Sequence, residues 1–268
     1  MAIFAIVVEG AHDASFLGQL LKARGFKAAN KLSFVPVEWR PLFPKNFPMD
    51  GENLERVMRF PEVFTKDDVS IGITTAGSDS RLISTLRAVV DAVGSDTVTG
   101  IAVFVDIDKH GAASRFASMQ EQIVAMNSAA SKEGQPGYPI IVPTAPGVME
   151  KGSPALGVYL FPDNTQNGAL EDILIECARV NHPEITTEAL ALIKKIDATC
   201  KDDQRDLKNL RSGMGFGKAT VGTIANVLKP GSSVASSLSQ TSWLTDAAME
   251  NAFVGKADSF LGSLLESN

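Results

Sequence analysis

The sequence has few cysteines and no metal-binding cysteine pattern. Of its 268 residues only Cys177 and Cys200 are cysteine, and neither belongs to a CxxC pair or a cysteine–histidine cluster. A structural zinc site and a disulfide framework both need such clusters, so the sequence predicts neither. We expect two buried thiols in a protein from a reducing compartment.

A secretory signal and a membrane span are also missing from the sequence. The opening segment, MAIFAIVVEG, has no basic stretch ahead of its apolar residues. No apolar run approaches the roughly 20 residues that a membrane-spanning helix needs. We therefore expect a cytoplasmic protein that does not enter a membrane.

Positive charge is in deficit. The chain has 25 Lys and Arg residues against 31 Asp and Glu, which gives a formal net charge of −6. A protein that binds nucleic acid by itself usually carries a basic surface. The totals therefore indicate either a small substrate, or contact with nucleic acid through a local basic patch, a metal ion or a partner.

The first 180 residues alternate between apolar strands and amphipathic helices. Short apolar runs rich in β-branched residues predict buried strands at 4–9, 34–39, 70–77, 100–106, 138–144 and 157–161. Periodic apolar stripes predict helices at about 11–24, 80–93 and 113–131, and from about 169 onward. This alternation indicates an α/β fold with a mainly parallel central sheet and helices on both faces.

Two stretches depart from the alternation. Four prolines interrupt residues 40–62, which predicts an insertion with a short helix near residues 52–58. Beyond residue 186 the sequence shows only helix and loop signals. We therefore divide the chain into an α/β domain, residues 1–185, and a helical C-terminal region, residues 186–268, packed on it.

Carboxylates stand where the predicted strands end. Glu9 closes the first strand, Asp106 and Asp108 close the fourth, and Asp13 and Glu171 lie in the first turns of following helices. In a parallel sheet these groups share one edge. Two carboxylates about 4 Å apart repel by about 4 kcal/mol at an effective dielectric constant of 20, so such a cluster requires a cation or bound protons.

Oxygen ligands without histidine or cysteine favour Mg²⁺, Mn²⁺ or Ca²⁺, and Mg²⁺ on one or two carboxylates suits phosphate chemistry. The alternative is that these residues only cap helices and turns. Asp13, Asp79 and Asp163 stand at positions where aspartate caps a helix or turn, and Glu171 would favour the dipole of its helix. The spacing alone leaves both interpretations open.

Three segments resemble, in order, the Toprim domain of topoisomerases, primases and related nucleases: VVEGAHDASFLGQLL, SIGITTAGSDSRL and VFVDIDKHG. The first carries an EGxxD motif and the third a DxD motif. This resemblance covers about residues 1–180. The segment LFPDNTQNGALEDIL and the helical C-terminus resemble a narrower group of uncharacterised prokaryotic Toprim-like proteins, related to overcoming-lysogenisation-type nucleases, over nearly the whole chain.

The resemblance implies a role for each acidic residue. Glu9 matches the glutamate that acts as general acid and base and touches the metal. Asp106 and Asp108 match the aspartates that hold Mg²⁺, and Asp13 matches the aspartate that supports them. Glu171 takes the place of the later acidic ligand in the overcoming-lysogenisation-type nucleases. The cofactor implied is Mg²⁺ or Mn²⁺.

Residues beside these motifs are candidates for contact with a substrate phosphate or a developing charge. They are His12, Ser78, Arg81, Lys109, His110, Asp163 and Lys218. The alternative for each histidine is that it is exposed to solvent and has no role in the reaction. Lys218 ends a basic segment that begins at residue 201. This segment either contacts phosphate or is only a solvated helix face with interleaved aspartates. We expect residues 213–218, GMGFGK, to form a flexible loop, because they lack the Walker pattern and a preceding strand.

The sequence thus predicts a metal-dependent phosphoryl-transfer protein, in particular a Toprim-type nuclease acting on nucleic acid. Two alternatives stay open: a non-catalytic protein that binds metal and phosphate or a nucleotide, and a purely structural protein. Since the chain has no Walker motif, a P-loop ATPase partner would act in trans. We expect Tyr138 and Tyr159 to pack in strands, so covalent strand passage is not predicted. The sequence leaves self-assembly open.

Overall fold

The computed structural model describes residues 1–43, 60–200 and 207–267. Its strands are β1 Ala2–Val8, β2 Lys27–Ala28, β3 Glu62–Lys66, β4 Val69–Thr75, β5 Val98–Asp106, β6 Met149–Glu150 and β7 Ala155–Phe161. Its helices are α1 Ala11–Ala23, α2 Leu82–Val93, α3 Ala112–Lys132, α4 Leu170–Asn181, α5 Pro183–Thr199, α6 Gly215–Leu228, α7 Val234–Gln240, α8 Asp246–Met249 and α9 Ala252–Leu265.

One sheet organises the molecule. Its strand order is β2-β3-β4-β1-β5-β7-β6. The four central strands, β4, β1, β5 and β7, run parallel, and the outer strands β2, β3 and β6 are antiparallel to their neighbours. The predicted α/β class with a mostly parallel sheet is therefore confirmed.

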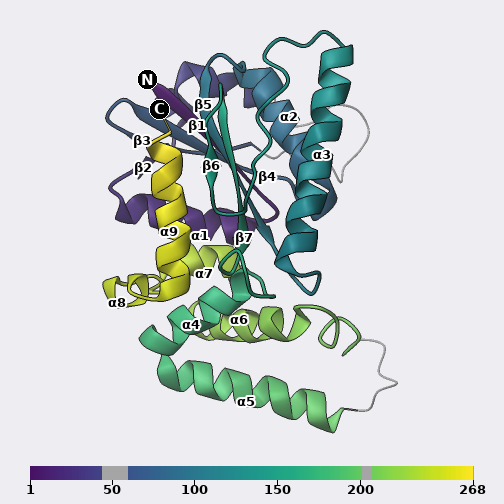
Figure 1. The fold of residues 1–268 in the computed structure, drawn as a ribbon. Coiled ribbons are helices and arrows are strands. Elements are labelled where there is room, and N and C mark those ends of the chain that lie inside the picture. Colours follow the sequence, from purple (N-terminus) through teal and green to yellow (C-terminus); the bar gives the residue numbers. More distant parts are fainter. Residues whose placement is uncertain (44–59, 201–206, 268) are drawn as a thin grey trace, which may run out of the picture.

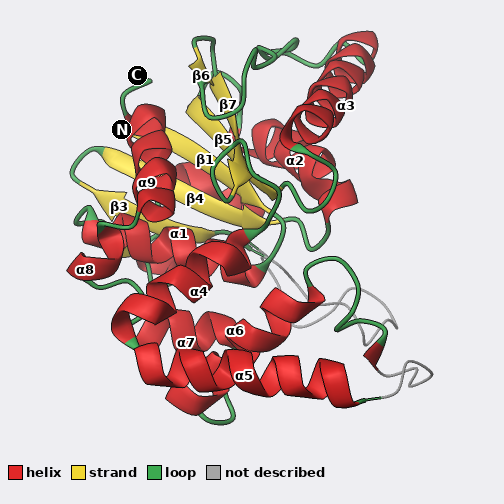
Figure 2. Ribbon diagram, turned by 60° about the horizontal axis from the view of Figure 1, so that its bottom comes forward, coloured by secondary structure: helices red, strands yellow, loops and turns green. Residues whose placement is uncertain are grey.

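Helices cover both faces of the sheet (Figure 1, Figure 2). Alternate side chains of β1 enter different cores, as the period of a strand requires. Phe4, Ile6 and Val8 pack in a core that includes residues of α1, α4 and α9. Ile3, Ala5 and Val7 pack in a second core with residues of α2 and α3. Because both faces are buried, the strand reads as a continuous apolar run.

The strand predicted at residues 34–39 is wrong. Residues Leu32–Phe34 and Val37–Leu42 form 3₁₀ turns instead. Pro36 and Pro41 lack the amide hydrogens that a central strand would donate. Trp39 lies in the sheet's second core, and its indole Nε1 donates to Ser70 Oγ at 2.8 Å. The helix predicted near residues 52–58 lies outside the described residues.

The strand predicted at residues 138–144 is also wrong, because this segment is bound to α3 rather than to the sheet. The Asn127 side chain accepts from Ile140 N at 2.9 Å and donates to Ile140 O at 2.7 Å. Gln120 Nε2 donates to the carbonyl of Pro143 at 2.8 Å. Amide side chains thus satisfy the backbone that a neighbouring strand would otherwise bind.

Candidate functional site

The carboxyl ends of β1, β5 and β7 meet at one edge of the sheet, because these strands are parallel neighbours. Glu9 follows β1, Asp106 ends β5, and Glu171 lies in the first turn of α4, which follows β7. A cavity of about 220 Å³ opens there, and its lining is Glu9, Gly10, Ala11, His12, Asp13, Asp106, Glu171 and Lys218. The structure therefore brings together most of the acidic residues singled out in the sequence.

Asp13 is fixed at the start of α1. Its Oδ2 accepts from Gly10 N at 2.7 Å, and only 9% of the residue is exposed. Burial, together with the negative charges of Glu171 and Glu9, raises the pKa of Asp13 from 3.8 to about 7. This carboxyl therefore holds a proton for much of the time at neutral pH when no cation is close.

Hydrogen bonds join the end of β5 and the turn after it to the start of α4. Asp106 Oδ1 accepts from Leu170 N at 3.0 Å. Asp108 adopts a left-handed backbone, with φ of 56°, and exchanges backbone hydrogen bonds of 2.8 and 3.1 Å with Gly168. Burial and the charges of Asp13 and Glu171 raise the pKa of Asp106 well above its ordinary value.

Glu171 has an unmet bonding requirement. It is 4% exposed, and its Oε2 is buried without a hydrogen-bond partner. Burial raises the pKa of this carboxyl, with added repulsion from Asp172 and Asp108. Helix α6 closes over it so tightly that a Cβ on Gly217 would lie 3.2 Å from the Cβ of Glu171. A buried carboxylate oxygen without a partner points to a proton or a cation.

Lys218 supplies positive charge from the first turns of α6. This position corrects the expectation of a flexible loop, because residues from Gly215 onward are helical. Desolvation alone would lower the pKa of Lys218, but the charges of Glu171, Asp106 and Glu9 raise it. Burial and the charge of Lys218 lower the pKa of His12, which favours the neutral imidazole. The cavity therefore combines several carboxyls with one ammonium group.

Arg115 and Asp79 form an ion pair next to the acidic residues, and the sequence did not predict this pair. Arg115 is 8% exposed, and its guanidinium binds both carboxylate oxygens of Asp79 at 2.7 and 2.8 Å. Its Nε donates to the carbonyl of Asp106 at 2.9 Å. Burial and the charge of Asp79 raise the pKa of Glu9. An arginine in the first turn of the helix after the DxD turn is the signal that could have indicated this contact.

The other candidates lie outside the cavity lining. Lys109 and His110 are exposed in the turn after β5. Ser78 Oγ lies 3.2 Å from Ser80 Oγ in the turn after β4, and Arg81 is exposed at the end of that turn. None of these four lines the acidic cavity.

Asp163 has a different surrounding from that of the acidic cluster. It is 3% exposed, and it binds Lys256 of α9 at 2.9 Å and the backbone amides of Thr165 and Gln166. Burial would raise the pKa of Asp163, but these bonds hold it well below its usual range. Its contacts join the turn after β7 to α9 rather than line the acidic cavity.

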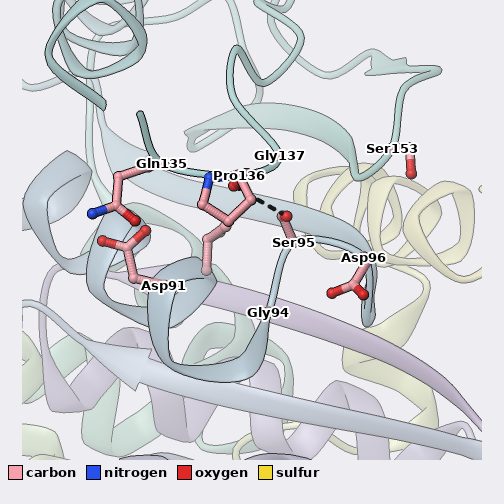
Figure 3. A pocket seen from close by; sticks show the side chains of 9 residues that line it. Asp91, Gly94, Ser95, Asp96, Gln135, Pro136, Gly137 and Ser153 are labelled. Carbon is pink, nitrogen blue, oxygen red and sulfur yellow. Dashed lines mark hydrogen bonds between the residues drawn. The ribbon is translucent and has the colours of Figure 1, made fainter. Parts of the chain in front are cut away.

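A separate cavity of about 400 Å³ lies at the opposite end of β5 (Figure 3). The nine residues of that strand span about 26 Å, so this cavity is remote from the acidic cluster. Its walls come from the turn after α2 and from residues 135–137, where Ser95 Oγ donates to the carbonyl of Pro136. Asp91 in this cavity already accepts from Tyr138 Oη at 3.0 Å. We assign no chemistry to it.

The described residues form neither a ready-made metal cluster nor a membrane-spanning helix. No group of three or more His, Cys, Asp or Glu side chains in that part of the chain is placed so that it could hold a metal ion. No helix within residues 1–43, 60–200 and 207–267 is both long enough and apolar enough to cross a membrane.

Comparison with known proteins gives a family and a fold. The crystal structure of the hypothetical protein PH0156 from Pyrococcus horikoshii OT3 is similar, with a TM-score of 0.52 and 19% identity over 99% of this chain and 96% of that chain. At this identity the likeness concerns the fold alone. A search of the curated proteins found no match. The model of the family described as "Protein of unknown function (DUF3226)" matches residues 4–255, so the chain belongs to the DUF3226 family.

Proposed function

We propose that this protein is a Mg²⁺- or Mn²⁺-dependent phosphoryl-transfer enzyme of the Toprim type, a nuclease acting on nucleic acid. The observation that carries the proposal is the partnerless Oε2 of Glu171, buried among Asp13, Asp106 and Glu9. The pKa of each of these four carboxyls is raised. Such a cluster gains the most when a cation neutralises it.

The donor set fits a hard dication. All the candidate ligands are carboxylate oxygens, which suit Mg²⁺ and Mn²⁺. Mg²⁺ commonly takes one or two carboxylates and completes its shell with water and substrate phosphates. A ready group of three protein ligands, which the described residues do not offer, is therefore not needed. Asp106 and Glu171 would hold the ion, with Asp108 beside them.

Three side chains of the site would each have a separate role in the proposed reaction. A bound dication polarises a phosphate and lowers the pKa of water. Glu9, whose pKa is raised by burial and by the charge of Asp79, would take up and release the proton, as general acid–base catalysis requires. The ammonium group of Lys218 would offset the negative charge of a bound phosphate. Arg115 would keep Asp106 and Asp79 in position.

The nucleic-acid substrate and the partner are part of the proposal. A net charge of −6 disfavours unaided binding to a polyanion, so the ion and Lys218 would provide the local attraction. The chain has no Walker motif, so an ATPase partner would act in trans.

Calorimetry with Mn²⁺ tests the metal site. We expect binding to the wild type and none to Asp106→Ala/Asp108→Ala. The matched control is Asp246→Ala/Glu250→Ala, which removes two exposed carboxylates from the region of α8. Circular dichroism checks that both double variants fold. Equal Mn²⁺ binding by all three proteins, or binding by none, would refute the metal site.

A cleavage assay then tests catalysis. Linear and circular DNA and RNA are incubated with Mn²⁺, with wild type and with Glu9→Gln. We expect Glu9→Gln to retain Mn²⁺ binding and to lose about 10²- to 10⁴-fold in cleavage rate, the range for a lost general acid or base. Metal binding without cleavage of any of these substrates would instead support the non-catalytic alternative.

A further inference from the structure

Helix α5 leaves one long face open at the edge of the molecule (Figure 1, Figure 2). It packs on α4 and α6, and its buried residues are Thr186, Ala189 and Ile193. Beside this buried strip there is exposed apolar surface, since Leu192 is 47% exposed and Val227 of the neighbouring α6 is 56% exposed. The described part of the chain leaves this side open to a partner.

A mainly apolar groove runs along this side. It has a volume of about 480 Å³ between α5 and α6, and its lining is Glu184, Ile185, Glu188, Ala189, Leu192, Thr223 and Val227. Apart from Thr223 and the two carboxylates of Glu184 and Glu188, this lining is apolar. A groove of this kind is typical of helix-to-helix docking.

Apart from Asp197, whose carboxylate pairs with Arg211, the acidic and basic residues of α5 lie in opposite halves of the helix. Glu184 and Glu188 lie in the N-terminal half, and Lys194 and Lys195 lie in the C-terminal half. Residues 184, 188, 191 and 195 follow the i, i+4, i+7 spacing of one helix face, and all are exposed. The residue at the centre of this face is the small Ala191. None of the four charges has an ion-pair partner among the described residues of its own chain.

Such a face is complementary to itself. In a two-fold symmetric contact each residue meets the residue at the mirrored position along the antiparallel partner helix. With the axis at Ala191, the acidic half of one helix lies along the basic half of the other. Glu188 of each copy then lies close to Lys195 of the second copy, and Leu192 lies beside the axis.

We propose that the occupant of this face is a second copy of the chain, docked through antiparallel α5 helices into a two-fold dimer. An interface of two helices per protomer is small, so the association falls in the weak, micromolar range. The acidic cluster lies at the sheet edge and contributes no residue to this contact. The dimer is therefore independent of the proposed metal chemistry.

Sedimentation velocity over a concentration series of about 1 to 300 µM tests the proposal. We expect a reversible monomer–dimer equilibrium for the wild type. Leu192→Asp, Glu188→Lys and Lys195→Glu each weaken it by about tenfold or more. The double variant Glu188→Lys/Lys195→Glu restores opposite charges across the axis and regains most of the association. The control is Glu121→Lys, an exposed reversal on α3, which leaves the dimer unchanged.

Two results would overturn the proposal. A monomer throughout the concentration range would remove the second copy as occupant and leave another protein's amphipathic helix as the candidate. The contact would lie elsewhere if the α5 substitutions leave the dimer affinity unchanged, or if the double variant does not regain that affinity. Mn²⁺ calorimetry on Glu188→Lys separates this result from the metal site, because its Mn²⁺ affinity is expected to match the wild type.

Discussion

The substitution Asp13→Asn tests the electrostatic account of the cluster without any metal. Asn mimics the protonated carboxyl, and its side-chain oxygen can still accept from Gly10 N. The pKa of Asp13 is about 7 in the folded protein against an ordinary value of 3.8. A folded carboxyl with a raised pKa contributes stability below its unfolded pKa, and this contribution is lost as the pH rises through the folded value.

The magnitude follows from the difference between these pKa values. Each pKa unit corresponds to about 1.4 kcal/mol, so ionising Asp13 in the folded state costs about 4 kcal/mol at pH 8 and protonating it costs about 2 kcal/mol at pH 5. Asp13→Asn avoids both costs. The variant should therefore be more stable than wild type, and its advantage should grow from pH 5 to pH 8.

The assay is urea unfolding at pH 5, 6, 7 and 8 with EDTA present, followed by circular dichroism. Asp68→Asn, an exposed site in the turn between β3 and β4, is the control and should show no such trend. The reasoning is refuted if the difference between Asp13→Asn and wild type is zero, or stays constant with pH.

Two further substitutions test the packing that holds the sheet. Gly72→Ala places a Cβ 2.5 Å from the Trp39 ring, so thermal unfolding should show a loss of about 1–3 kcal/mol, whereas Gly255→Ala in open space on α9 should be neutral or stabilising. Asn127→Ala leaves both backbone groups of Ile140 without their partners, and urea unfolding should show a loss of about 2–3 kcal/mol. A loss below 0.5 kcal/mol in either test would contradict the packing or hydrogen-bond argument behind it.

The central strands could be predicted from the sequence because both of their faces are buried. Such strands read as apolar runs whatever lies beside them, as for residues 100–106 of β5. The edge strands could not. Both residues of β2 are exposed and those of β6 are half-buried, so neither gives an apolar run. The segment at 138–144 has the composition of a strand, but Asn127 from a distant helix takes its backbone bonds.

The position of the acidic residues could be predicted because parallel strands end at one edge of a sheet. Glu9, Asp13, Asp106 and Glu171 do line a single cavity, whereas their role as metal ligands stays a prediction. Arg115 could not be assigned in the same way. Its contacts reach Asp79, 36 residues away in the sequence, and no local pattern encodes a pair at that distance.

The C-terminal helices form part of the α/β fold, and this determines how the site is built. Phe260 of α9 packs 5.4 Å from the rings of both Phe104 and Tyr159 in the sheet. Lys218 of α6 lines the acidic cavity. Residues 1–185 alone would uncover the part of the sheet that α9 covers and would lose the wall of the cavity that Lys218 forms. We therefore expect this fragment to unfold without a cooperative transition in calorimetry, whereas a sharp transition with intact Mn²⁺ binding would show that the α/β domain is sufficient for the site.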